Sequence, residues 1–411
     1  MPSPERFSQT PMAIKAAILM AALGYFVDIY DLILFSIVRV KSLQGLGVPA
    51  EEILSSGMLL LNMQMAGMLI GGVLWGVLGD KKGRLSVLFG SIFLYSVANL
   101  ANGFVHSVGA YAVLRFIAGV GLAGELGAGI TLVSEIMPKE SRGYGTMAVA
   151  GVGILGGVAA GLIGDAFAWR TSYIIGGAMG LALLALRLGV YESGMFTQAK
   201  DSGVRRGDFR SIFIDRGRTV KYVCSILIGM PIWFVIGILV TLAPEFGKAL
   251  GMPVAPNPAR SILFLYLGCA LGDFLSGGLS QYFRSRKKIA YGFLAATALF
   301  SAAYLASAGA SLVHHYTLCL LLGFAVGYWA IFVTMASEQF GTNVRATVTT
   351  TAPNFVRGSL VPMSLSFQAA KAQWGILPGA AVVGAFVLLL AVFALGRLDE
   401  TYGKELDYYE A

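Results

Sequence analysis

Stretches of mostly apolar residues alternate with short charged or turn-rich breaks along the whole chain. A helix that crosses the hydrocarbon core of a bilayer needs about 20 predominantly apolar residues. Because the apolar stretches reach that length, each one is predicted to form a membrane-spanning helix. The pattern predicts twelve spans, at residues 13–40, 54–79, 85–105, 109–136, 143–167, 169–188, 220–246, 259–283, 288–309, 313–336, 347–371 and 375–396.

One long polar stretch, residues 191–219, interrupts this pattern and leaves six predicted spans on each side. We therefore predict an N-terminal six-helix bundle over residues 1–190 and a cytoplasmic linker over 191–219. A C-terminal six-helix bundle with a short cytoplasmic tail is predicted over 220–411. The expected fold class is an all-α membrane protein built from two pseudo-symmetric bundles.

A weak internal repeat relates the two halves. Glu135 ends the fourth predicted span, and Arg142 follows it after seven residues. Glu338 ends the tenth span, 203 positions after Glu135, and Arg345 again follows after seven residues. Such duplication is typical of secondary transporters, which bind their solute between the repeats near the middle of the membrane.

Composition and charge agree with this interpretation. The chain is 56% hydrophobic and only 13% charged, whereas a soluble domain carries about 25% charged residues. The net charge of +8 does not indicate nucleic-acid binding, because the basic residues follow the topology. With both termini in the cytoplasm, 22 of the 30 lysines and arginines lie on the cytoplasmic side and six on the other, which is the positive-inside pattern. We expect an inner-membrane protein.

The loop after the second span carries a motif. Its residues Gly76, Leu78, Asp80, Gly83 and Arg84 resemble the signature G-x-L-x-D-R-x-G-R of the major facilitator superfamily. The glycines permit close helix approach and a tight turn, and the acid can interact with a helix N-terminus or a nearby arginine. The resemblance implies the major facilitator fold and a loop that latches the two bundles in one state of a transport cycle.

Segments of the first half resemble one branch of that family, the metabolite:proton symporters. They run from Gly24 to Asp31 in the first span and from Arg115 to Glu125 in the fourth, and the sixth span opens with Trp169. The resemblance implies cotransport of a carboxylate or zwitterion with protons by a monomer. This sequence departs from the branch in the first span, where Asp28 stands in the place of a glutamate.

Ionisable residues inside the spans are expensive in a bilayer and are therefore functional candidates. Asp28 and Asp31 share one helix face, and Arg115 and Glu125 lie in the fourth span. An acid without a cation beside it retains a proton more readily. We predict that Asp31 carries the proton, that Arg115 is its switchable partner, and that Asp28 and Glu125 tune it. The alternative is a static ion-pair network.

The second half offers candidates for the substrate. Arg357 can bind a carboxylate or phosphate through its planar fork, and Asp273 lies at a similar depth. The alternative is that these two residues pair with each other. Further candidate cavity residues, each with helix packing as the alternative, are Tyr30, Asn62, Gln64, Trp233, Tyr266, Tyr328, Trp329 and Asn354.

The sequence predicts a proton-coupled symporter of a small organic anion or zwitterion that works by alternating access. Its expected partners are the solute, protons and membrane lipid. The alternatives are an antiporter or uniporter of a sugar or drug-like solute, and a membrane sensor that does not transport. We expect no enzyme, cofactor or metal site, because the chain lacks a nucleophile–base set, metal-spaced histidines and a phosphate-binding loop.

Overall fold

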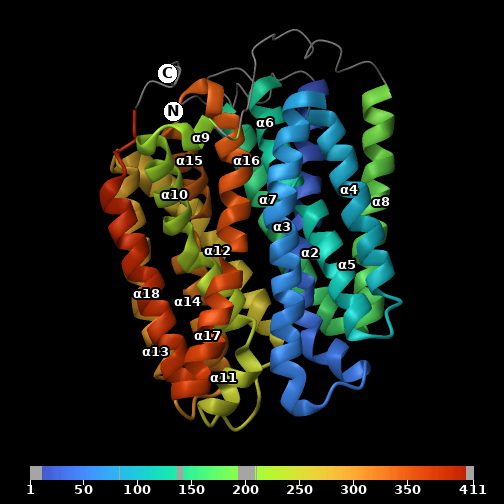
Figure 1. The fold of residues 1–411 in the computed structure, drawn as a ribbon, viewed down its shortest axis with the longest axis vertical. Helices are drawn as coiled ribbons and strands as arrows, with labels where there is room; N and C mark the ends of the chain where they lie inside the picture. The colour runs from blue at the N-terminus through green and yellow to red at the C-terminus, as the bar shows by residue number, and fades with distance from the viewer. Residues whose placement is uncertain (1–11, 83, 137–141, 193–208, 210, 404–411) are drawn as a thin grey trace.

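The computed structural model describes residues 12–82, 84–136, 142–192, 209 and 211–403, and nearly all of them are helical (Figure 1). The helices of the first half are α2 (Met12–Gly45), α3 (Ile53–Lys82), α4 (Arg84–Asn102), α5 (Val108–Leu122), α6 (Glu125–Ile136), α7 (Arg142–Ala166) and α8 (Trp169–Glu192). The second half contains α9 (Ser211–Ile214), α10 (Arg216–Phe234), a π-helical segment (Val235–Val240), α11 (Ala243–Ala249), α12 (Pro258–Tyr282), α13 (Arg286–Leu305), α14 (Leu312–Val326), α15 (Trp329–Glu338), α16 (Thr342–Gly358), α17 (Leu360–Trp374) and α18 (Ile376–Arg397).

Every predicted span corresponds to one helix or to consecutive helical segments, and the seventh covers three of them, namely α10, the π-helical segment and the start of α11. Among the described residues, ten helices are long and apolar enough to cross a membrane, and a shorter apolar helix covers the third span. The eleventh span is divided between α16 and α17. Several helices begin where the sequence supplies a cap. Ser107 caps α5, Asn257 caps α12 and Ser285 caps α13, each accepting a backbone N–H bond.

Two spans are interrupted at equivalent positions, which the sequence pattern did not predict. The fourth span breaks between α5 and α6 at Gly124, and the tenth breaks between α14 and α15 at Gly327. These glycines are again 203 positions apart. A side chain at Gly124 would lie 2.8 Å from the Ser91 Cβ, and one at Gly327 would lie 2.6 Å from the Gly272 Cα. Close approach of a neighbouring helix therefore requires glycine at each break.

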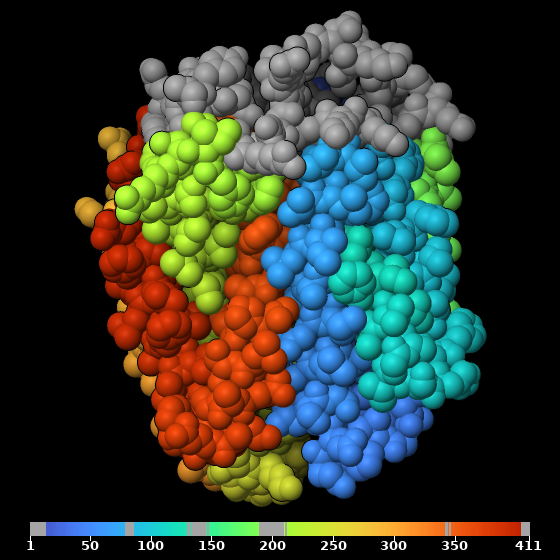
Figure 2. All heavy atoms as spheres, in the orientation of Figure 1, coloured from blue at the N-terminus to red at the C-terminus, as the bar shows by residue number. Residues whose placement is uncertain are grey.

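Helices α2–α8 and α10–α18 form two groups side by side (Figure 1). Helix α2 begins and α18 ends at the upper end in that view, which we call the upper face, and the opposite end is the lower face. Figure 2 shows α16 and α17 packed against α3 along the seam between the groups. In this seam Ser364 donates to Asn62 Oδ1 at 2.7 Å, and Asn354 donates to the Ala123 carbonyl at 2.8 Å.

The segment after α18 docks on the start of α13 at the upper face. Glu400 accepts the Ser285 hydroxyl at 2.5 Å and the backbone N–H groups of Arg286 at 3.0 Å and Lys287 at 3.2 Å. Burial raises the pKa of Glu400, but these bonds and one from the Tyr402 N–H outweigh it and hold the pKa below its ordinary value. The carboxylate thus satisfies N–H groups that the first turn of α13 leaves open.

Replacement of Glu400 by glutamine is expected to lower the thermal stability at pH 7 modestly, by less than about 1 kcal/mol, because the carboxylate is exposed and screened. The pKa of Glu400 is lower in the folded state than its ordinary value of 4.5. Its contribution is therefore complete above that value and is lost as the pH falls through the lowered pKa. Melting curves of both proteins between pH 7 and pH 3 should converge at the acidic end, and a constant difference would contradict this origin.

Candidate functional site

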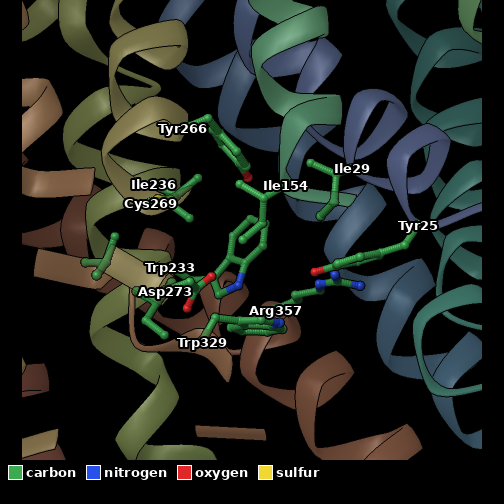
Figure 3. Close-up of a pocket in the computed structure, with 12 residues that line it drawn as sticks. Tyr25, Ile29, Ile154, Trp233, Ile236, Tyr266, Cys269, Asp273, Trp329 and Arg357 are labelled. Carbon is green, nitrogen blue, oxygen red and sulfur yellow. The ribbon is translucent and has the colours of Figure 1, made fainter. Parts of the chain in front are cut away.

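A small cavity lies between the two groups of helices (Figure 3). Its lining residues in α2 and α12 lie near the middle of these helices. The first group contributes residues from α2 and α7, and the second contributes residues from α10, the π-helical segment, α12, α14, α15 and α16. The lining residues are Tyr25, Ile29, Ile154, Ile232, Trp233, Ile236, Tyr266, Cys269, Asp273, Val326, Trp329 and Arg357. The cavity volume is about 40 Å³, which holds a few water molecules. A space of this size is too small for an organic solute, and we call this arrangement the closed state.

Arg357 is the cation of this cavity. Its side chain is 2% exposed, and Nη2 lies 3.8 Å from Oδ2 of Asp28 on the other side of the seam. The guanidinium carbon lies 5.5 Å from the centre of a Trp329 ring. The Tyr25 hydroxyl also points toward the guanidinium (Figure 3). At 3.8 Å the charged groups attract each other without a hydrogen bond, so this ion pair between the bundles is loose.

Asp273 lines the cavity but does not pair with Arg357, which corrects that alternative. Its Oδ1 accepts the backbone N–H of Ala330 at 3.1 Å, at the start of α15. The break at Gly327 leaves the first N–H groups of α15 without partners inside the helix. Asp273 reaches them from α12 and thereby holds Trp329, the first residue of α15, against the cavity.

Several donors that line the cavity have no acceptor. The indole nitrogens of Trp233 and Trp329 and Nε of Arg357 are buried, and none makes a hydrogen bond within the described part of the chain. The Tyr25 hydroxyl lies near the Trp329 indole, but without hydrogen-bond geometry. Leaving a buried donor unpaired costs about 1–3 kcal/mol. A ligand rich in acceptor oxygens would recover that free energy.

Asp31 lies inside the first bundle rather than in the cavity. It is completely buried, and neither carboxylate oxygen makes a hydrogen bond among the described residues. The Asn99 amide faces it. A side chain at Gly176 of α8 would lie 2.3 Å from its Oδ1, so the carboxylate is packed against α8.

Arg115 forms no ion pair with Asp31 in this state, so their predicted role as switchable partners stays a prediction. Its guanidinium donates to Gln64 Oε1 and lies over the rings of Phe35, at 5.0 Å, and Tyr173, at 5.9 Å. The Gln64 carboxamide and the two aromatic rings thus bind the guanidinium that the sequence analysis had paired with Asp31. The charge of Arg115 still acts on Asp31 through space.

Glu125 is held by a cation that the sequence analysis missed. Arg187 of α8 forms a buried ion pair with it and also donates to the carbonyls of Met20 at 3.0 Å and Leu88 at 3.5 Å. Arg187 lies near the end of the sixth predicted span and was therefore counted with the cytoplasmic residues. The signal that could have revealed it was Glu125 itself, since a buried acid needs a cation. Glu125 is thus part of a fixed ion pair in this state.

The other predicted residues divide into two classes. Trp233, Asp273, Arg357, Tyr266 and Trp329 line the cavity. The remaining candidates form hydrogen bonds within the helix packing and do not line the cavity. Tyr30 donates to the Ser172 carbonyl, Tyr328 donates to the Ile228 carbonyl, Gln64 holds Arg115, and Asn62 and Asn354 bond across the seam. Polarity alone does not separate these classes, because both place a polar group away from lipid.

The cavity is also lined by residues that the sequence did not single out, namely Tyr25, Ile29, Ile154, Ile232, Ile236, Cys269 and Val326. Of the predicted loop motif, Gly76 lies in α3, where a Cβ would be 3.7 Å from the Thr351 side chain of α16. Gly83 and the side chains of Asp80 and Arg84 lie outside the described residues.

Two ion pairs join the bundles at the lower face. Arg39 of α2 donates to both carboxylate oxygens of Glu245 in α11, at 2.6 and 2.7 Å, and its side chain is 1% exposed. Arg260 of α12 lies 3.3 Å from Asp165 of α7, and both of these side chains are substantially exposed. The Arg39 side chain of the first pair is shielded from water, whereas both side chains of the second pair are in contact with it.

Replacement of Glu245 by glutamine is expected to open the lower face, because it leaves the buried Arg39 without a counter-charge, at a cost of about 3–5 kcal/mol. Cys269 in the cavity reports this opening. Its modification by a small, membrane-impermeant thiol reagent applied from the lower face should accelerate at least about tenfold.

Arg260→Gln removes the exposed pair and is the matched control, with less than about a threefold effect. Cys269→Ser identifies the reacting thiol. An equal rate in Glu245→Gln and the parent protein would show that the Arg39–Glu245 pair does not hold the lower face closed.

Known proteins resemble this chain along most of its length. A sequence profile described as Major Facilitator Superfamily matches residues 16–361. The chain is 25% identical over 411 residues to a gentisate transporter of Corynebacterium glutamicum, covering 94% of this chain and 88% of that protein. It is 28% identical over 389 residues to a 3-(3-hydroxy-phenyl)propionate transporter of Escherichia coli, covering 87% and 91%.

A niacin transporter of Acinetobacter baylyi is 26% identical over 365 residues, with 80% of each chain covered. Among solved structures, a D-xylose–proton symporter has a similar fold. The TM-score is 0.70 at 19% identity, and the match covers 96% of this chain and all of that one. At this identity the likeness concerns the fold alone.

Proposed function

The chain belongs to the Major Facilitator Superfamily, and from this premise we propose that it is a proton-coupled symporter of a small, planar organic carboxylate. Membership confirms the family, the fold class and the non-enzymatic function that the sequence predicted. The protein is a multi-pass membrane transporter. The observation that carries the proposal is Arg357, a buried and loosely paired cation among aromatic rings at the seam between the bundles.

The chemistry of the cavity supports a carboxylate. The Arg357 fork can bind two carboxylate oxygens at once, and the unpaired indole N–H groups of Trp233 and Trp329 offer further donors. The rings of Trp233, Tyr266 and Trp329 supply flat apolar surfaces for an unsaturated body. Gentisate, niacin and 3-(3-hydroxy-phenyl)propionate, the solutes for which the relatives are named, each combine a carboxylate with a ring.

Proton coupling is proposed to run through the two aspartates of α2. Asp28 is the partner of Arg357 in the closed state, so a substrate carboxylate competes with Asp28 for the same guanidinium. Once Asp28 is displaced from Arg357, Asp28 and Asp31 are two buried acids, three residues apart, with no ion-pair partner among the described residues. Two negative charges at such a short separation repel each other, which favours protonation of one of the two acids. Asp31, which is buried without a hydrogen bond among the described residues, is our candidate for the proton carrier.

Transport requires the cavity to open alternately to each face. We propose that residues 1–190 and 220–411 rock as two domains joined by the linker 191–219, with the seam contacts forming and breaking around the site. By the distribution of basic residues, we place the upper face in the cytoplasm and the protein in the inner membrane. The protein is proposed to act as a monomer.

The proposal is tested with purified protein in liposomes. An acidic exterior should drive accumulation of labelled nicotinate, gentisate or 3-(3-hydroxyphenyl)propionate, and a protonophore should abolish the accumulation. The external medium should become more alkaline as solute enters. Proton movement in the opposite direction would show an antiporter, and uptake indifferent to the pH gradient would show a uniporter. Preference for xylose or a cationic drug would overturn the assigned substrate class.

A further inference from the structure

A second cavity, of about 200 Å³, opens between α12 and α13 of the second bundle. Its walls are apolar, formed by Leu275 and Leu279 of α12, Ile289 and Phe293 of α13, and Phe324 of α14. Lys288, in the first turn of α13, is its charged lining residue. The cavity therefore has an apolar body and a cation at the end nearer the upper face.

The protein does not fill this groove. Helix α12 packs closely against α14 and makes fewer contacts with α13. A side chain added at Gly278 of α12 or at Gly292 of α13 would meet no atom within 4 Å. Leu271 and Phe274, on the same stretch of α12, are each 59% exposed. Because a transporter of this family lies in a bilayer, this surface contacts acyl chains.

The four cations around the start of α13 differ in their pairing. Arg286 is paired with Glu338 at 2.7 Å, and the Lys287 ammonium donates to the Leu398 carbonyl at 2.6 Å. The side chains of Arg284 and Lys288 are exposed, and neither forms an ion pair with a described residue. Within the described part of the chain, two positive charges therefore have no ion-pair partner at the level where α13 enters the membrane. Basic pockets between spanning helices on the cytoplasmic side are suited to anionic lipid headgroups.

We propose that this groove binds one anionic phospholipid from the leaflet at the upper face. The phosphate lies against Lys288 and Arg284, and an acyl chain runs down the groove past Gly292. Gly292 is one helical turn below Lys288, about 6 Å along the axis. A phosphate at Lys288 therefore places the acyl chain of the same lipid beside Gly292. The bound lipid would cover apolar surface of α12 and α13 and stabilise the second bundle.

The full-length protein in neutral detergent tests this site with dioleoyl phosphatidylglycerol as the probe and phosphatidylcholine of the same chains as the comparison. Melting temperature and native mass spectrometry should show saturable stabilisation by one phosphatidylglycerol molecule. Lys288→Gln should weaken its apparent affinity about fivefold, and Arg284→Gln should act in the same direction. Gly292→Leu should abolish saturable binding, because the side chain occupies the groove.

Matched controls lie outside the groove. Lys221→Gln removes a lysine near the upper face of α10, and Ala298→Leu enlarges an exposed residue of α13 that does not line the cavity. Both should bind phosphatidylglycerol as the parent does. Equal stabilisation by the two lipids, or unchanged phosphatidylglycerol affinity in Lys288→Gln, would overturn the proposal. Neither outcome depends on transport, so the lipid site and the proposed symport fail separately.

Discussion

Replacement of Arg357 by lysine is expected to weaken carboxylate binding by at least about a hundredfold. Lysine retains the positive charge but loses the planar pair of N–H donors that bind both oxygens of a carboxylate. In a cavity closed from water, the lost hydrogen bonds to a charged group are each worth about 1.5–3 kcal/mol. The measurement is the dissociation constant of the best substrate, from thermal-shift titration of the purified proteins at one pH.

Arg260→Lys is the matched control for this experiment, because Arg260 is an exposed arginine of the same bundle, far from the cavity lining. It should bind substrate as the parent protein does. The Arg357→Lys protein must first be shown to retain the parent's melting temperature within a few degrees. A folded Arg357→Lys protein that binds within about threefold of the parent would exclude direct recognition by the guanidinium.

Replacement of Asp31 by asparagine is expected to abolish acid-driven accumulation and to leave substrate exchange intact. Asparagine fits the same space and cannot take up or release a proton. Exchange of internal for external substrate requires only that the loaded protein change conformation, so it needs no net proton movement. We expect accumulation to fall at least about a hundredfold in liposomes with an acidic exterior, and counterflow of labelled substrate to remain within a few-fold of the parent.

Glu52→Gln is the control for the removal of a charge, because Glu52 is an exposed acid of the same half of the chain. It should accumulate substrate normally. Normal pH-driven uptake by Asp31→Asn would remove this residue from the proton pathway and direct attention to Asp28. Loss of both accumulation and counterflow would show instead that Asp31 is needed for the packing of α2 against α8.

The spans could be predicted because the bilayer imposes a length and a polarity that are visible in sequence. The motif from Gly76 to Arg84 likewise indicated the family, which the comparison with known proteins confirmed. The helix breaks at Gly124 and Gly327 were not predicted, since each depends on the approach of another helix. In the sequence these glycines do not differ from the many others that serve helix packing.

The partners of the buried charges were the least predictable part. Arg357 meets Asp28, a residue more than 300 positions away, through the contact between bundles. Asp273 was available for Arg357 by depth but is used by the start of α15, and that demand exists only because the tenth span is broken. Gln64 and two aromatic rings take up Arg115. Residue type and depth identified buried charges such as Asp31 and Arg357 but missed Arg187, and the pairing of all of them is decided by tertiary contacts.

The narrow space around Arg357 has a consequence for measured affinities. A solute can enter the cavity only when the two bundles have separated, so molecules in the closed state do not bind it. The apparent dissociation constant therefore equals the intrinsic one divided by the fraction of open molecules. If one molecule in a hundred is open, the apparent constant is a hundredfold larger than the intrinsic one. Weakening the Arg39–Glu245 contact should therefore strengthen apparent binding and slow the return to the closed state. The variants that bind the solute most tightly are expected to transport it slowly.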